Sequence, residues 1–333
     1  MRLLILGGTV FLGRALTDAA IARGHTVTHL HRGRSAASDD RVETLLRDRE
    51  EVPFLRDIDP SRTWDAVVDT SGYLPQVVAR SAEALRDRVG MYVFVSSISA
   101  YASFESEDFD EDAPLQADPD PLPSERTPEL YGALKAACER VVSRAFGARA
   151  LIVRPGLLVG PNDPTDRFTW WPWRIAKGGR FVAPGRPERN IQFIDVRDVA
   201  EWTISMLESS TGGIFQVDGP ARALTMGKFI EACRAVGGSA STPEWVSDGA
   251  LLAHEVRPWF EMPLWIPESN AEYRGFMSAS IERALRHGLK IRALERTIAD
   301  TLRWANERPA SREWKAGLSP EREAALLDHI CRK

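Results

Sequence analysis

The sequence predicts an α/β fold, in which a doubly wound parallel sheet is followed by a smaller C-terminal part. Three observations support this fold class. An apolar run at residues 3–6 passes through a glycine turn into a helical pattern, apolar strands then alternate with helical segments as far as residue 155, and the alternation is lost after that point. We therefore expect one domain over residues 1–155 and a second part over residues 156–333, from which segments at about 190–220 return to the core of the first.

The glycine turn at residues 7–13 (GGTVFLG) indicates a nucleotide site. Gly7 and Gly8 allow a sharp turn and a close approach to a ligand, and Gly13 allows the helix that follows to pack tightly on its strand. The free N–H groups at the start of that helix suit a pyrophosphate. Val10 takes the place of the middle glycine of the usual fingerprint. The turn predicts a Rossmann-type dinucleotide-binding domain, with cofactor contacts at Gly7, Thr9, Phe11, Leu12 and Gly13.

Composition and charge exclude several classes of protein. The chain has 333 residues, 44% of them hydrophobic, and its formal net charge of −4 gives no field that would attract nucleic acid. The six His and three Cys show no metal-ligand spacing, and an odd number of Cys fits reduced thiols, so we expect neither a metal nor a disulfide framework. No apolar run approaches the roughly 20 residues of a membrane span. We expect a soluble, cytoplasmic protein without nucleic-acid or membrane partners.

The second strand, at residues 25–30, ends where a dinucleotide fold reads the adenosine ribose. An NAD site usually has an acidic residue at this point, whereas arginine accommodates the 2′-phosphate of NADP. Here the chain has Arg32 and Arg34 and no acid, which favours NADP over NAD, although both arginines are alternatively solvated loop charges. A short third strand at residues 42–46 is followed by Asp48, a candidate adenine contact.

Further strands at residues 64–69, 91–95 and 150–155 bring polar residues to the same edge of the sheet, because ligands gather at the carboxyl ends of parallel strands. A helix is expected from Pro75 to about Arg88. The expected cofactor contacts at these strand ends are Thr70, Ser71, Gly72 and Pro155, and Ser97 lies at another.

Residues 104–130 are rich in acidic residues and proline, and are long for a connection without secondary structure. Such a segment is either a lid near a site or a solvated surface loop, and the sequence does not separate the two.

Tyr131 and Lys135 are four residues apart on a predicted helix and therefore share one face. A phenol with a pKa near 10 is a poor base at neutral pH, but a nearby ammonium favours its ionised form. Such a tyrosine accepts a proton from an alcohol as a hydride leaves for a nicotinamide, or returns it in the reverse reaction. Ser97 is placed to hold the same substrate oxygen.

The sequence resembles the short-chain dehydrogenase/reductase superfamily, specifically its extended branch of NAD-dependent epimerases and dehydratases. The resemblance covers nearly the whole chain, through residues 7–13 (GGTVFLG), 96–101 (SSISAY), 131–135 (YGALK), 153–161 (VRPGLLVGP) and 193–200 (FIDVRDVA). It implies that Tyr131 is the catalytic acid/base, that Lys135 lowers its pKa and holds the nicotinamide ribose, and that Ser97 positions the reacting oxygen. It also implies a homodimer formed through the helices near residues 75–88 and 131–146.

Departures from the family pattern narrow these expectations. The turn with Val10 resembles a subgroup that reads Gly-Gly-Thr-x-Phe-Leu-Gly, and some proteins similar to that subgroup are thought to bind RNA rather than catalyse. Sugar 4,6-dehydratases have an acidic pair where this chain has Ile98 and Ser99, so dehydration is not expected. Nucleotide-sugar epimerases often have an arginine in the approach to the last motif, where the nearest candidate is Arg189.

The second part contains an aromatic and basic stretch at residues 166–174. Aromatic faces and guanidinium groups hold a ring and an anion, which makes Arg174 and Arg189 candidate substrate contacts. The favoured alternative is that the Trp residues form the core of a small domain, because aromatic bulk is usually packing.

The leading hypothesis is an NADP-preferring oxidoreductase or epimerase that acts on a carbinol or carbonyl of a polar, sugar-like small molecule. The alternative is a non-catalytic cofactor-binding regulator or RNA-associated protein on the same fold. The complete set of Ser97, Tyr131 and Lys135 favours catalysis, and the acidic balance disfavours RNA.

Overall fold

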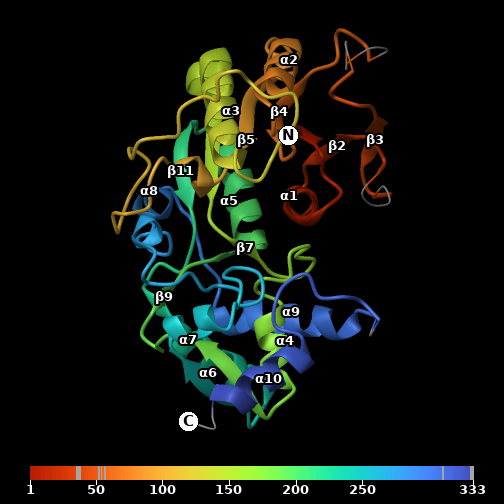
Figure 1. The fold of residues 1–333 in the computed structure, drawn as a ribbon. Helices are drawn as coiled ribbons and strands as arrows, with labels where there is room; N and C mark the ends of the chain where they lie inside the picture. Colours follow the sequence, from red (N-terminus) through yellow and green to blue (C-terminus); the bar gives the residue numbers. More distant parts are fainter. Residues whose placement is uncertain (35–38, 52, 54, 56–57, 310, 331–333) are drawn as a thin grey trace.

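The computed structural model describes residues 1–333 except 35–38, 52, 54, 56–57, 310 and 331–333. Its centre is a parallel sheet of seven strands within the described residues, in the order β11-β6-β5-β4-β1-β2-β3 (Figure 1). The strands are β1 (Arg2–Leu6), β2 (Thr26–His31), β3 (Glu43–Leu46), β4 (Trp64–Asp69), β5 (Val89–Val95), β6 (Ala150–Pro155) and β11 (Gly213–Val217). The α/β fold class expected from the sequence is confirmed.

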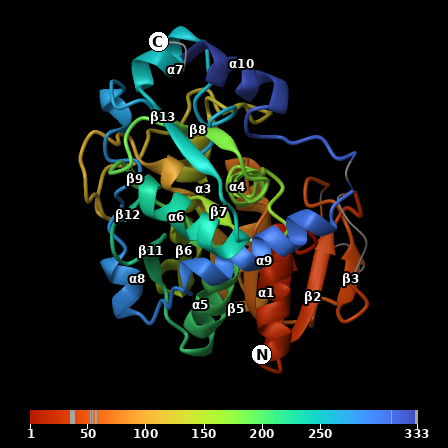
Figure 2. The same ribbon diagram turned by 90° about the horizontal axis from the view of Figure 1, so that it is seen from below.

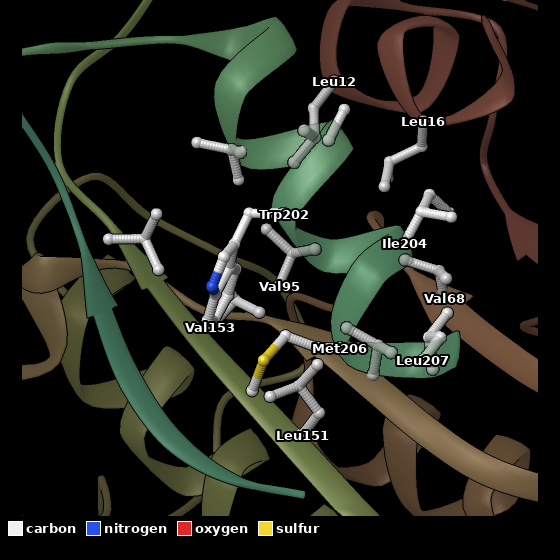
Figure 3. Close-up of a cluster of buried hydrophobic side chains, with 14 of the residues drawn as sticks. Leu12, Leu16, Val68, Val95, Leu151, Val153, Trp202, Ile204, Met206 and Leu207 are labelled. Carbon is white, nitrogen blue, oxygen red and sulfur yellow. The ribbon is translucent and has the colours of Figure 1, made fainter. Parts of the chain in front are cut away.

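Helices cover both faces of this sheet. The helices α1 (Phe11–Ala22) and α5 (Val196–Glu208) lie on one face, and α2 (Pro75–Leu85) and α3 (Tyr131–Phe146) lie on the other. Leu12, Leu16 and Ala20 recur every four residues on α1 and are all buried, which explains why this segment is a helix. Figure 3 shows Leu12 and Leu16 facing the same cluster as Trp202 and Ile204 of α5.

The first strand, β1, shows why the strands of this sheet have continuously apolar sequences. Leu3 and Ile5 join the cluster beneath α1 and α5, whereas Leu4 and Leu6 join the one beneath α2 and α3. All four side chains have no exposed surface. Both faces of a central parallel strand are covered, so the run is apolar throughout rather than alternating.

The direction of strand order reverses beside β1, which pairs with β2 on one side and β4 on the other. The chain moves outward to β3 and then returns across β1 to β4. In open α/β sheets, ligands bind at the carboxyl ends of the strands at such a reversal.

The chain after residue 155 has its own core but also contributes to the sheet. Trp170 and Trp171 are 1% and 0% exposed in an aromatic cluster with Phe168 and Phe229, so the packing interpretation of the Trp residues is correct for these two. Figure 2 shows β8 and β13 side by side in this second part. Meanwhile α5 and β11 pack into the first part. The division of the chain into two domains at residue 155 therefore stays a prediction.

The remaining elements are short connections and the helices of the second part. They are the 3-10 turns at Ile98–Ala100, Gly147–Arg149 and Ala271–Tyr273, the strands β7 (Leu158–Val159), β8 (Arg180–Pro184), β9 (Asn190–Ile191), β10 (Ile194–Asp195), β12 (Leu224–Thr225) and β13 (Thr242–Val246), and the helices α4 (Trp170–Ala176), α6 (Met226–Gly237), α7 (Asp248–Ala253), α8 (Glu282–Arg286), α9 (Leu294–Glu307) and α10 (Pro320–Ile330). Within the described ranges, none of the helices has the length and apolar composition needed to cross a membrane.

The acidic, proline-rich segment at residues 104–130 has neither helix nor strand, but it is packed against the fold. Phe104 and Phe109 are buried in a small aromatic cluster, and Glu111 accepts a hydrogen bond from the backbone N–H of Gln216 in β11. The first half of the segment is therefore anchored structure and not a solvated loop.

Candidate active site

A cavity of about 810 Å³ opens at the carboxyl ends of the sheet strands, next to the reversal at β1. It is lined by the glycine turn, the ends of β2, β4, β5 and β6, the first turn of α3 and residues 124–126. The structure brings most of the predicted catalytic and cofactor residues to this one cavity, namely Gly7, Thr9, Phe11, Leu12, Gly13, Arg32, Arg34, Asp48, Thr70, Ser71, Ser97, Tyr131, Lys135 and Pro155.

The geometry of the glycine turn fits a pyrophosphate. Gly7 and Gly8 have φ angles of 105° and 92°, and a Cβ on Gly8 would lie 2.6 Å from the His29 ring. A Cβ on Gly13 would lie 2.6 Å from the Gly8 Cα, so both positions require glycine. The helix that follows has no side-chain cap at its N-terminus, which leaves first-turn N–H groups for an anion.

Val10 fits the turn because of its backbone conformation. It precedes α1 with φ −125° and ψ 140°, an extended conformation that any residue adopts, and the residue is 43% exposed. The replacement of the middle glycine therefore strains nothing at this position. The next residue, Phe11, has a positive φ of 36°, in addition to Gly7 and Gly8 of the same turn.

The end of the cavity beside β2 and β3, where the sequence predicts the adenosine and which we call the adenosine end, is cationic. Arg32, Arg34 and Arg47 line it, and the Arg32 guanidinium is loosely paired with Asp48 at 3.7 Å and Glu50 at 3.8 Å. The last residue of β2 is a histidine and not the acid of a usual NAD site.

His31, that last residue of β2, was not among the predicted contacts. Its Nδ1 accepts a hydrogen bond from the Gly33 N–H, which implies that the ring proton is on Nε2. Nε2 is buried and has no hydrogen-bond partner among the described residues. Burial lowers the pKa of His31, which favours the neutral ring.

Lys135 lies in the wall of the cavity and is largely buried, and its ammonium donates to the carbonyl oxygens of Gly72 and Val95, both at 2.8 Å. Gly72 itself does not line the cavity, and its role is to supply this carbonyl. Burial lowers the pKa of Lys135 to about 8. The ammonium has a third N–H that neither carbonyl uses, and its nitrogen lies 4.7 Å from the Tyr73 ring centroid and 4.9 Å from that of Phe94.

Tyr131 differs from the expectation drawn from its spacing to Lys135. Burial raises the pKa of the Tyr131 phenol, the neighbouring Tyr73 raises it further, and a hydrogen bond to the Ser97 hydroxyl and the charge of Arg126 oppose these effects. The Lys135 ammonium is directed at the two carbonyls and is not among the causes of the shift. The expected depression of the tyrosine pKa by Lys135 is wrong for this structure.

The close approach of Tyr131 to the Ser97 turn depends on Gly132. A Cβ on Gly132 would lie 2.0 Å from the carbonyl oxygen of Ser99, so only glycine lets α3 begin this near the end of β5. Ser97 caps the turn, and its Oγ accepts from the Ser99 N–H at 3.1 Å. The sequence thus positions both hydroxyl groups through one small residue.

Sequence reasoning missed a buried ion pair under the site. Arg49 makes a bidentate pair with Asp69 at 2.6 and 2.7 Å, and the Tyr92 hydroxyl donates to the same carboxylate at 2.8 Å. The charge of Arg49 holds the pKa of Asp69 below its ordinary value against burial, which acts in the opposite direction. Because the two partners are 20 residues apart in sequence, no local pattern indicates the pair.

The structure does not bring the two predicted substrate arginines to the cavity. Arg174 pairs with Glu323 and donates to the carbonyl oxygens of Gly178 and Arg180. Arg189 is 7% exposed and donates to Asp248 and to the Ile266 carbonyl. Both guanidinium groups are committed to contacts within the second part, so their placement does not support a substrate role.

The family follows from comparison with known proteins. Residues 3–217 match the family described as NAD dependent epimerase/dehydratase. The epimerase family protein SDR39U1 of Bos taurus is 27% identical over 260 residues, which are 74% of this chain and 83% of that protein. The chloroplast stem-loop binding protein of 41 kDa b of Arabidopsis thaliana is 24% identical over 254 residues, which are 71% of this chain and 63% of that protein.

A solved structure shows the same fold. The UDP-glucose 4-epimerase of Thermus thermophilus, in complex with NAD, superposes with a TM-score of 0.62 and 19% identity, and the match covers 93% of this chain and 100% of that one. A likeness at this identity shows the fold alone. With the match over residues 3–217, the chain belongs to the NAD-dependent epimerase/dehydratase family.

Proposed function

We propose that the protein is an NAD(P)-dependent reductase or epimerase that transfers a hydride at a carbinol or carbonyl carbon of a polar, sugar-like small molecule. The observation that carries this proposal is that Ser97, Tyr131 and Lys135 line one cavity with the glycine turn. A cofactor-binding protein without catalysis has no need of all three side chains at that place.

The chain's own residues account for the proton. The nicotinamide cofactor supplies the hydride donor or acceptor when it is bound. In reduction, the Tyr131 hydroxyl gives its proton to the oxygen of the carbonyl, which becomes an alcohol, and in oxidation the phenolate takes that proton back. The Ser97 hydroxyl would hydrogen-bond the same oxygen, and the remaining N–H of Lys135 would hold the nicotinamide ribose when the cofactor is bound. A protonated phenol at neutral pH, which burial of Tyr131 favours, suits the reductive direction.

The test is turnover by the purified protein. The protein is mixed with NADPH and each of a panel of aldoses, ketoses and simple carbonyl compounds, and the loss of NADPH absorbance is measured. A Tyr131→Phe variant is assayed in the same way. We expect the variant to lose at least about 100-fold in turnover while it binds NADPH as the wild type does, because general acid catalysis contributes about that much. Equal turnover by the two proteins would refute the role of Tyr131.

We propose further that NADP is preferred over NAD. Three guanidinium groups at the adenosine end, from Arg32, Arg34 and Arg47, support this, as does the absence of an acid at the end of β2. A 4,6-dehydratase is not proposed, because Ile98 and Ser99 occupy the position of the acidic pair in dehydratases.

An RNA-associated function is the second candidate. The name of the Arabidopsis relative, a stem-loop binding protein, favours it, and the net charge of −4 disfavours it. A gel-shift titration with a stem-loop RNA and a scrambled strand at physiological salt tests it, and binding without NADPH turnover would replace the enzymatic proposal.

The proposed assembly is a homodimer, and the proposed location is the cytoplasm. The resemblance of α2 and α3 to the dimer helices of the family supports the first. The free, buried thiols of Cys138 and Cys233 fit a reducing compartment, and Cys331 lies outside the described residues. Light scattering at several concentrations tests the dimer, and a monomer of 37.1 kDa throughout would contradict it.

A further inference from the structure

The second half of the acidic, proline-rich segment is fixed over the cavity by contacts to the helices of the first part. Gln116 donates from its amide to the Ser99 carbonyl at 2.9 Å, and Arg140 of α3 binds Asp118 and the Gln116 carbonyl. At the start of α2, the Gln76 amide donates to the Pro123 carbonyl at 2.9 Å. These tethers place residues 124–126 in the cavity wall.

Arg126 is the cation that this arrangement presents to the cavity. Its guanidinium carbon lies 4.4 Å from the centroid of the Tyr73 ring, and among the residues that the structure describes it has no ion-pair partner. Arg49, by contrast, is neutralised by Asp69, and Arg32 is shared between two carboxylates. A guanidinium on an aromatic face keeps its outward N–H donors free for a ligand.

Arg126 lies near the proposed catalytic residues Tyr131 and Lys135 and not at the adenosine end of the cavity. The Lys135 ammonium lies 4.7 Å from the centroid of the same Tyr73 ring, so Tyr73 links the two cations. The charge of Arg126 also reaches Tyr131, whose pKa it lowers. An anion bound by Arg126 is therefore held near the group that Tyr131 protonates.

We propose that Arg126 binds an oxyanion of the substrate, a carboxylate or a phosphate, beside the carbon at which Tyr131 acts. The assignment rests on the proposed function for the identity of the reacting group, but the anion site itself does not. A guanidinium presents two parallel N–H groups that match the two oxygens of either anion. Tyr73 is a positioning residue, because it holds the guanidinium from one side.

The experiment measures anion binding by calorimetry on the protein saturated with NADP⁺, which by the proposal above would occupy the arginines of the adenosine end. The probes are malonate and methylphosphonate, with neutral malonamide as the uncharged control. We expect at least one anion to bind the wild type, and its affinity to fall by about 10-fold or more in Arg126→Ala and less in Arg126→Lys. Comparison of malonate with methylphosphonate distinguishes a carboxylate site from a phosphate site.

The control variant is Arg296→Ala, because Arg296 has a 72% exposed side chain on α9 and does not line the cavity. It should bind the anion as the wild type does, and NADP⁺ affinity should be unchanged in all three variants, which verifies folding. Equal anion affinity in the wild type and Arg126→Ala, or no binding of either anion to the wild type, would overturn the proposal. Because anion binding needs no turnover, an inactive protein that binds the anion through Arg126 separates this proposal from the enzymatic one.

Discussion

The close approach of α1 to the glycine turn makes Gly13→Ala the sharpest test of the cofactor site. The added Cβ would lie 2.6 Å from the Gly8 Cα and 2.7 Å from the Gly8 nitrogen. Both are backbone atoms, so the turn itself has to move. Overpacking of this kind costs about 1–3 kcal/mol, and the better helix propensity of alanine offsets about 1 kcal/mol of that.

We therefore expect Gly13→Ala to lose up to about 2 kcal/mol in the free energy of unfolding and about 10-fold in NADPH affinity, because the shifted N–H groups no longer match the pyrophosphate. The matched control is Gly249→Ala in α7, where nothing lies within 4 Å of the added Cβ and φ is not positive. That variant should be neutral or gain up to about 1 kcal/mol.

Urea unfolding and fluorescence titration with NADPH measure the two effects. If Gly13→Ala matches the wild type in both, while Gly249→Ala behaves as expected, the claim that this contact shapes the cofactor site is refuted.

Three further predictions concern charge. Arg32→Ala should raise the Michaelis constant for NADP about 10-fold and leave that for NAD unchanged, because it removes a 2′-phosphate contact; equal effects on the two cofactors in steady-state kinetics would rule that contact out. Burial raises the pKa of Asp218 to about 8, so ionising it costs folding stability progressively from about pH 4 to about pH 8. Asp218→Asn should thus gain on the wild type by up to about 1.4 kcal/mol per pH unit over that range in urea unfolding, and a constant difference would contradict this. Reduction needs a protonated Tyr131, and burial raises the pKa of this phenol, so turnover should persist through neutral pH. In Arg126→Ala, a cation that lowers the pKa of Tyr131 is gone, and the fall of kcat at alkaline pH should move to higher pH. If that fall stays at the same pH in the variant, Arg126 does not influence the pKa of Tyr131.

The parts of the site that local sequence determines were predictable. The strands β1, β4, β5 and β6 are apolar runs, and their carboxyl ends must meet at one edge of the sheet, so Thr70 and Ser97 were placed correctly at the cavity. The helix that begins at Tyr131 carries Lys135 on the same face by its period alone. These residues needed only the fold class and the element boundaries.

The parts of the site that long-range contacts determine could not be predicted from the sequence. Arg126 lies in a segment without periodicity, and its position depends on the bond between Gln76 and Pro123, which are 47 residues apart. Arg174 differs from the prediction for a related reason, because it pairs with Glu323 and does not face the cavity. An arginine among Trp residues has the same sequence pattern whether it faces a ligand or pairs with a carboxylate such as Glu323, and only the tertiary structure separates the two cases.

The charge around Tyr131 connects the cofactor, the substrate and the direction of the proposed reaction. Sequence spacing assigned the control of its pKa to Lys135, but the ammonium is bonded to the carbonyls of Gly72 and Val95, and Arg126 is the cation whose charge reaches the phenol. An oxyanion bound at Arg126 would neutralise that cation, which favours the protonated phenol still more. The substrate that we propose would thus help to keep Tyr131 as a proton donor, so anion binding and carbonyl reduction would support each other at the same site.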